Sequence, residues 1–174
     1  MKTSCFRASF AAVAVVIITT LMFVVPKASA AEWTDDDRSY VAQNCSSIQI
    51  SLKNLQVSDA NTRAYLGNIL EGTTTRYITR LNVRLIRNNI SVPDLIRDQS
   101  DITAVKAAFS ASYVKYARSL EDLIKINCRT NPQGFLSQLV VVRTNRAALH
   151  DVVEQTKSVV TTHIDNVEAF KESL

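Results

Sequence analysis

The feature that most constrains this chain is a long apolar repeat near its C-terminus. From Phe135 to Phe170 the step between repeat positions alternates between four and three residues, which is the spacing of a heptad. The repeat positions are Phe135, Leu139, Val142, Arg146, Leu149, Val153, Thr156, Val160, His163, Val167 and Phe170. Such a stripe is stable only when other helices cover it. The sequence therefore predicts an all-α fold, an elongated antiparallel bundle of three to four long helices with coiled-coil-like heptad packing.

Residues that interrupt helices are scarce. The 174 residues include only three Gly and three Pro, whereas a β-sandwich or barrel would need a turn signal about every ten residues. Apolar spacing predicts helices over about 34–55, 62–89, 101–127 and 132–172. A break at Ser58 and Asp59 separates the first two helices. A connection over 91–100, with a short helical turn through Leu95 and Ile96 after Pro93, precedes the third.

The N-terminus has the three parts of a secretory signal peptide. Lys2 and Arg7 precede an apolar run over 10–25, and Ala28-Ser29-Ala30 follows as a cleavage site. We expect residues 1–30 to be removed and residues 31–174 to form a single helical-bundle domain. The alternative is an uncleaved membrane anchor. In either case the remaining chain is exported to the cell envelope or the exterior.

Charge is distributed unevenly along the exported chain. Removal of Lys2, Arg7 and Lys27 with the signal lowers the formal net charge from +4 to +1. The net charge is then −3 over 31–62, +7 over 63–146 and −3 over 147–174. The total charge therefore gives no reason to expect a nucleic-acid partner, although the middle of the chain is distinctly basic.

Two cysteines remain after removal of the signal. Cys45 and Cys128 are an even number in an oxidising compartment, which predicts a disulfide between them. Two buried free thiols are the alternative. A metal site is a poorer interpretation, because the chain has no C-x-x-C spacing and its histidines lie elsewhere in the sequence.

Four arginines form a charged row in the predicted second helix, the arginine ridge: Arg76, Arg80, Arg84 and Arg87. Arginine forks bind carboxylates and phosphates through paired hydrogen bonds, so the ridge could bind an anionic surface polymer, a phospholipid headgroup or a nucleic acid. No aromatic residues alternate with the arginines as a single-strand stacking platform requires, which argues against a nucleic acid. The alternative is a solvated face whose positive charge is balanced by acidic residues on the first and fourth helices.

No motif predicts a catalytic residue, a cofactor or a metal. His150 and Glu154 lie four residues apart and could share a metal, but no third ligand is evident and a solvent-side hydrogen bond is the alternative. The acidic run 35–37 suits a helix start capped by Thr34 better than a calcium loop, because it lacks the Gly turn and the distal Glu. The protein is therefore expected not to be an enzyme.

Two polar residues occupy positions of the apolar repeat. Arg146 is expected to extend its charge to solvent or to pair with a carboxylate from another helix. His163 is expected to fill the core or its boundary, with a pH-sensitive contact as the alternative.

Two segments and two arginines carry a family resemblance. Residues 81–85, the segment from Cys128 through Pro132 to Phe135, and then Arg143 and Arg146 resemble those of uncharacterised exported helical proteins of small-genome bacteria. The resemblance implies an exported bacterial helical protein. That group carries no assigned activity, so the resemblance implies no site residue.

Together these patterns predict a non-enzymatic structural or binding protein at the cell envelope or exterior. Its expected partner is an unknown protein or an anionic envelope polymer, with membrane contact only if the N-terminal segment is uncleaved. An extracytoplasmic holdase-type chaperone is the alternative, and an enzyme of unknown class is third. Val167 and Phe170 extend past the predicted third helix, so another part of the protein has to cover them. The cover is either the 91–100 connection or a second copy of the chain, in a homo-oligomer that forms through the C-terminal helix.

Overall fold

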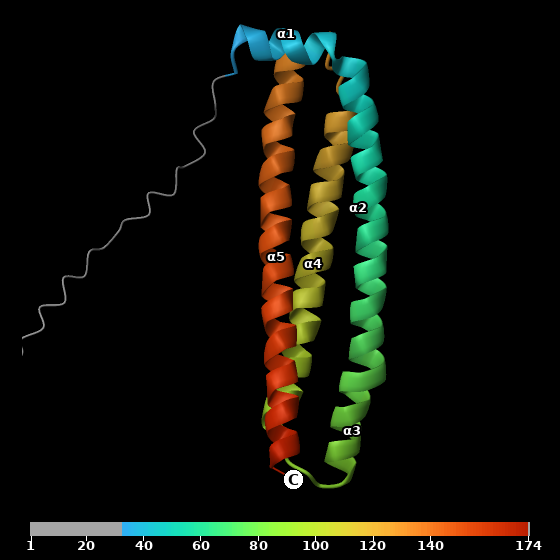
Figure 1. The fold of residues 1–174 in the computed structure, drawn as a ribbon, viewed down its shortest axis with the longest axis vertical. Coiled ribbons are helices and arrows are strands. Elements are labelled where there is room, and N and C mark those ends of the chain that lie inside the picture. The colour runs from blue at the N-terminus through green and yellow to red at the C-terminus, as the bar shows by residue number, and fades with distance from the viewer. Residues whose placement is uncertain (1–32, 174) are drawn as a thin grey trace, which may run out of the picture. The chain divides into compact units, whose positions relative to one another are not determined.

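The computed structural model describes residues 33–173, and the predicted signal peptide 1–30 lies outside the described residues. The elements in chain order are α1 (Asp35–Gln43), α2 (Cys45–Thr73), the π-helical turn η1 (Thr74–Ile78), α3 (Thr79–Arg87), α4 (Pro93–Lys125) and α5 (Pro132–Glu172) (Figure 1). No strand occurs in this part of the chain, which confirms the predicted all-α class. Over the same residues, no helix has the length and apolar content that a membrane crossing needs.

The first break in the helices lies earlier than predicted. The expected break at Ser58 and Asp59 is wrong, because both residues lie inside α2 and neither is a Gly or Pro that would end a helix. The chain instead bends at Asn44, whose backbone has φ −96° and ψ 11°. The backbone N–H and the side-chain amide of Asn44 both donate to the carbonyl of Tyr40, at 3.0 and 2.9 Å. These bonds satisfy the end of α1 and allow a new helix to start at Cys45.

A π turn joins α2 to α3 without interrupting the helix. The N–H of Thr79 donates to the carbonyl of Thr74, five residues earlier, as a π-helix requires. Three buried residues in this region, Thr74, Ile78 and Asn82, follow one another at steps of four. In a regular α-helix each step of four overshoots one turn by about 40°, so the row would drift off one face. The wider turn reduces that drift and keeps the row facing α4.

The last two helices both begin at a proline. α4 starts at Pro93, so the prediction of a connection over 91–100 is wrong; proline is tolerated in a first turn and the helix continues from there. α5 spans the predicted range 132–172. At its start the side chain of Asn131 accepts a hydrogen bond from the N–H of Gly134, at 2.9 Å. A Cβ at Gly134 would lie within 2.4 Å of that cap, which explains the glycine.

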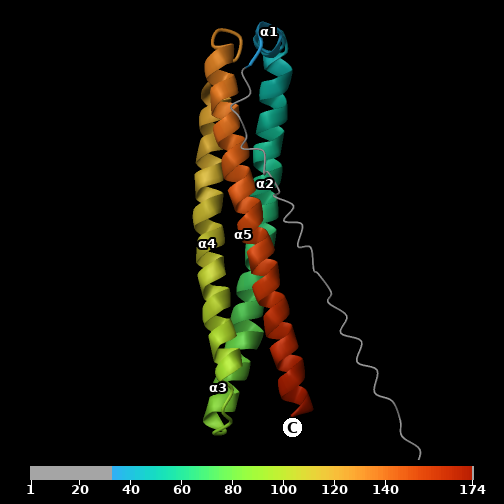
Figure 2. The same ribbon diagram turned by 90° about the vertical axis from the view of Figure 1, so that its left-hand side faces the viewer.

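The long helices lie side by side around α4. α4 and α5 run in opposite directions, and α2 lies along the other side of α4 (Figures 1 and 2). No Cα atom of α2 lies within 8 Å of one in α5, so the backbones of these two helices flank α4 at a distance from each other. α1 lies across the helix ends in Figure 1 and is seen end-on in Figure 2.

Two clusters of buried apolar residues hold the helices together. The larger lies at the end nearest α1 and contains Tyr116, Leu120, Leu123, Phe135 and both cysteines, with Trp33 and Val41 contributed by the first residues of the described chain. The smaller contains Leu85, Val92 and Leu95. Val167 and Phe170 pack against this smaller cluster, so α3 and its link to α4 cover the end of α5.

Candidate functional site

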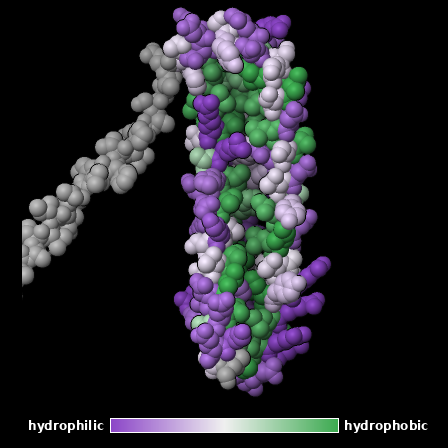
Figure 3. Space-filling model, viewed as in Figure 1, coloured by the Kyte–Doolittle hydropathy of each residue, from purple (hydrophilic) through white to green (hydrophobic). Residues whose placement is uncertain are grey.

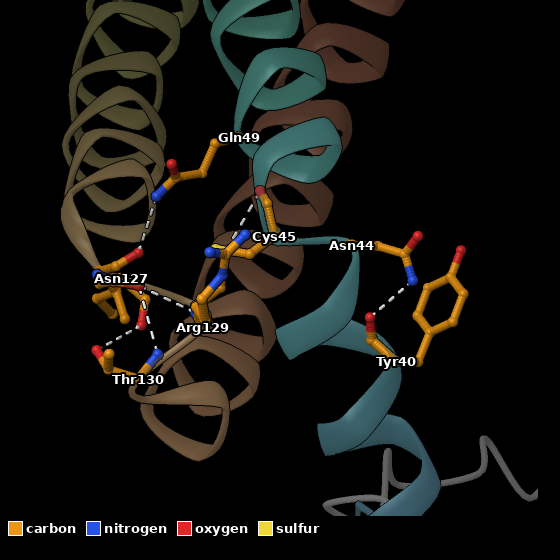
Figure 4. Close-up of a disulfide and its surroundings, with 9 residues drawn as sticks. Tyr40, Asn44, Cys45, Gln49, Asn127, Arg129 and Thr130 are labelled. Atoms are coloured by element: carbon orange, nitrogen blue, oxygen red, sulfur yellow. Dashed lines mark hydrogen bonds between the residues drawn. A yellow bond between two sulfur atoms is a disulfide. The ribbon is translucent and has the colours of Figure 1, made fainter.

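The disulfide predicted from the sequence agrees with the structure. The sulfur atoms of Cys45 and Cys128 lie 2.00 Å apart and their Cα atoms 5.4 Å apart (Figure 4). Beside them, the amide of Gln49 donates to the carbonyl of Ile126, at 3.2 Å. The disulfide therefore joins the bend after α1 to the turn after α4, at the closed end of the helices. Its surroundings are buried and apolar, which indicates a structural role.

All four members of the arginine ridge are exposed at the opposite end. Arg76 lies in η1, and Arg80, Arg84 and Arg87 lie in α3. Among residues 33–173, none of the four has a carboxylate oxygen within 4.0 Å. The acidic neighbours that a solvated, charge-balanced face would supply are therefore not in contact with the ridge.

Three of the four arginines line a groove between the η1–α3 segment and α5. The groove has a volume of ≈ 590 Å³ and includes Arg76, Arg80 and Arg84 on one wall and Glu168 on the other, whereas Arg87 is not part of it. Apolar side chains form much of its surface, and they are Ile78, Leu81, Ile164 and Val167. The groove thus combines a row of cations that have no carboxylate partner in the described part of the chain with an apolar lining, which suits a ligand that is both apolar and anionic.

A separate hollow lies nearer the middle of α2, on the same side of the helices as the groove. It has a volume of ≈ 190 Å³ and lies between Leu66 of α2, Phe109 and Tyr113 of α4, and Leu149 and Val153 of α5. In Figure 3 an apolar surface runs lengthwise between α5 and the α2–α3 segment, with hydrophilic side chains along both borders. We call this surface, comprising the groove and the hollow, the open face.

A network of buried polar side chains underlies the groove. The carboxylate of Asp98 accepts hydrogen bonds from Asn166 at 3.0 Å and from Nδ1 of His163 at 3.2 Å. On the α3 side, the amide of Asn82 donates to the carbonyl of Leu95 at 3.0 Å and to the side chain of Gln99 at 2.8 Å. These bonds tie α3, α4 and α5 together beneath the groove. His163 is buried, as expected for a core position, and it also lines the groove.

A smaller polar group borders the hollow. The hydroxyl of Tyr116 donates to Asp59 at 2.6 Å, and Arg146 lies 3.9 Å from the same carboxylate. Both alternatives expected for Arg146 are partly met, because its side chain is exposed to solvent and also approaches a carboxylate of another helix. Burial, followed by the hydrogen bond to Asp59, raises the pKa of Tyr116 well above its usual range.

The remaining candidates do not assemble into a reactive site. His150 and Glu154 are both exposed, and the described residues contain no group of three or more His, Cys, Asp or Glu side chains that could hold a metal ion. Asp37 forms a capping box with Thr34, as the helix-start interpretation predicts. Donation from the hydroxyl and then the backbone N–H of Thr34 lowers the pKa of the Asp37 carboxyl.

Sequence reasoning missed two parts of this site. It gave no sign that Leu66, which lines the hollow, is exposed, because an apolar stripe does not reveal whether a partner is present. It also missed the pairing of Asp98 with His163, which are 65 residues apart. A polar residue in an apolar repeat, such as His163, was the only available signal of a buried partner.

Comparison with protein-family models, curated proteins and solved structures gives no match to this chain. Its function therefore has to be argued from the chemistry of the open face.

Proposed function

We propose that the protein is a non-enzymatic binding protein of the cell envelope or exterior, and that it receives its partner on the open face. The observation that carries this proposal is the groove of ≈ 590 Å³, in which apolar side chains lie beside three arginines that contact no carboxylate of residues 33–173. Exposed apolar surface flanked by charge commonly marks an interaction site. Export is the expectation that the N-terminal sequence provides.

The finer architecture belongs to the same proposal. We propose that the helices form an elongated antiparallel bundle in which α4 and α5 pack through the heptad positions of α5. Support comes from the burial of Phe135, Val142 and His163, which are three positions of the repeat. Arg146, another repeat position, is exposed beside the hollow, so the repeat contributes both to the core and to the open face.

The experiment compares two isoleucines that are similarly exposed. Ile164 lines the groove and is 51 % exposed, whereas Ile96 lies on α4 outside both parts of the open face and is 46 % exposed. Mature protein carrying Ile164→Asp should lose a specifically captured envelope partner, and Ile96→Asp should retain it. Both variants should keep the helicity of the parent, because exposed substitutions change stability little. Equal capture by both variants would contradict the proposal.

A holdase-type chaperone is a second candidate, and the apolar stripe of the open face favours it. A holdase binds many unfolded chains, so it should suppress aggregation of unrelated reduced or heated clients. That suppression should disappear with Ile164→Asp and persist with Ile96→Asp. A binding protein with one dedicated partner would leave the aggregation of unrelated clients unchanged.

A further inference from the structure

We propose that the open face binds an acidic amphipathic α-helix of a partner protein, which lies lengthwise between α5 and the α2–α3 segment. This inference rests on the proposed binding function and names the chemistry of the partner. Its support is threefold: the spacing of the helices, the exposed apolar side chains and the row of unpaired arginines.

The spacing of the helices leaves room for another helix. Packed helices lie 8–10 Å apart, and both α2 and α5 pack against α4 but have no Cα atoms within 8 Å of each other. A helix placed over the apolar strip between them would contact both neighbours, as the fourth member of a four-helix arrangement does. On α5 the open face extends from Arg146 to Glu168, which corresponds to about 33 Å at 1.5 Å per residue. A partner helix of about six turns would fill it.

The exposed apolar side chains provide the contacts for an apolar stripe. Leu66 and Ile164 remain 43 % and 51 % exposed although both line the open face, and Tyr77 is 70 % exposed at the groove. Side chains of this kind would be covered by a stripe of leucine-like residues at helical spacing. Because they lie on both walls, one helix can cover residues from α2, η1 and α5 together.

The charge of the open face selects an acidic partner. Five arginines line it, and they are Arg63, Arg76, Arg80, Arg84 and Arg146. The lining carboxylates are Asp59 and Glu168, and Asp59 already accepts the Tyr116 hydroxyl. A basic helix would meet uncompensated like charge, whereas glutamates beside the apolar stripe of an acidic helix would pair with the arginine forks.

The spacing of the arginines favours a helix over a lipid or a simple polyanion. Arg76, Arg80 and Arg84 repeat every four residues, so one row of cations recurs about every 6 Å along the groove wall. A neighbouring helix presents carboxylates at the same interval, as in charge pairing beside a helix seam. A single lipid headgroup would engage only part of the row. A polyanion without an apolar stripe would leave the apolar surface exposed.

The test uses two synthetic peptides of about 22 residues, the length that six turns require. Both carry leucine at heptad core positions; one carries glutamate at the flanking positions and the other lysine. Binding to the mature protein is followed by fluorescence anisotropy, and peptide helicity by circular dichroism. We expect the glutamate peptide to bind and to gain helicity only with the protein. The lysine peptide should bind about tenfold more weakly or not at all.

Variants of the protein locate the binding. Replacing Arg76, Arg80 and Arg84 together by Gln should weaken binding of the glutamate peptide by about tenfold, corresponding to about 1.4 kcal/mol. Arg87→Gln, a change in the same ridge but outside the groove, should leave the affinity within about twofold because rim charges contribute little. Ile164→Asp should abolish binding, and Ile96→Asp should not.

Several outcomes would overturn the inference. It fails if the two peptides bind equally or if neither binds. It also fails if poly-glutamate or anionic phosphatidylglycerol vesicles bind with the same dependence on Arg76, Arg80 and Arg84 while the glutamate peptide does not. If the peptides fail but Ile164→Asp still removes a captured envelope partner, the partner chemistry is wrong and the proposed function stands. If Ile164→Asp changes no capture at all, the proposed function fails as well.

Discussion

The disulfide end and the groove end of the helices are both helical, but their apolar side chains are buried to different degrees. At the disulfide end, Leu123 and Cys128 are 0 % exposed, and α1 lies across the ends of the other helices. At the groove end, buried polar residues such as Asp98 and His163 lie beside the smaller apolar cluster, and apolar side chains such as Ile164 remain on the surface. The difference indicates that stability is concentrated at one end and that the other is available for binding.

The polar layer adds to this contrast. The oxygen of the Asn82 side chain is buried without a hydrogen-bond partner among the described residues. A buried unsatisfied group destabilises a fold by about 1–3 kcal/mol. The groove end is therefore expected to open locally at lower free energy than the disulfide end.

The largest expected effect comes from removing the disulfide. A loop of 83 residues closed by Cys45 and Cys128 stabilises the fold by about 4–5 kcal/mol in the chain-entropy model. The double variant Cys45→Ala/Cys128→Ala should lower the free energy of unfolding by about that amount, measured by urea denaturation. Reduction of the parent protein should have a similar effect. A loss below about 1 kcal/mol would show that the disulfide end does not depend on its cross-link.

The next prediction compares one large side chain at each end. Phe135→Ala, at a site 2 % exposed, should destabilise the protein by about 3–5 kcal/mol because it leaves a cavity in the larger cluster. Ile164→Ala, at the open face, should change stability by at most about 0.5 kcal/mol. Chemical denaturation of both variants measures the difference, and similar losses at the two sites would remove the contrast between the ends.

Asp98→Ala probes the polar layer. The substitution deprives His163 and Asn166 of their shared acceptor and should destabilise the protein by about 1–3 kcal/mol. Hydrogen exchange should show the increased opening mainly in α3 and the C-terminal part of α5. Uniform loss of protection, including the residues around Cys128, would mean that the two ends unfold as one unit.

The smallest effect is a dependence on high pH. Burial and Asp59 raise the pKa of Tyr116 in the folded protein above its ordinary value of 10.0. The unfolded chain therefore loses this proton first, so its contribution to stability is present below about pH 10 and is lost as the pH rises above that value. Between pH 9 and pH 11 the parent should lose more stability than Tyr116→Phe, as measured by urea midpoints. Equal losses would contradict the assignment.

Much of the fold could be predicted from local signals. Pro132 and the heptad spacing define α5, Thr34 marks the start of α1, and the even cysteine count gives the pair that the structure places together. The end of α1 at Asn44 and the start of α4 at Pro93 were not predicted, for different reasons. Asn44 is bent by hydrogen bonds within its own turn, and Pro93 starts α4 where the sequence suggested only a short turn.

The candidate site was predictable only in part. The arginine ridge follows from spacing alone, but its position beside α5 depends on the packing of segments distant in the sequence. The exposure of Leu66 is equally non-local, because it depends on a neighbouring helix that the fold does not supply. Periodicity identifies which side chains share a face, and tertiary packing decides whether that face is covered.

The π turn at Thr74–Ile78 sets the phase between two halves of one continuous helix. In a regular α-helix each residue adds about 100° of rotation, and the wider turn absorbs about one residue of that rotation. Deletion of a single residue within the turn, such as Thr75, would restore an ordinary α-helix and leave Leu85 of α3 in nearly its present phase relative to the cysteine anchor of α2. A one-residue deletion there should therefore be far less damaging than one in the middle of α5, which would rotate the two halves of the heptad repeat by about 100° relative to each other.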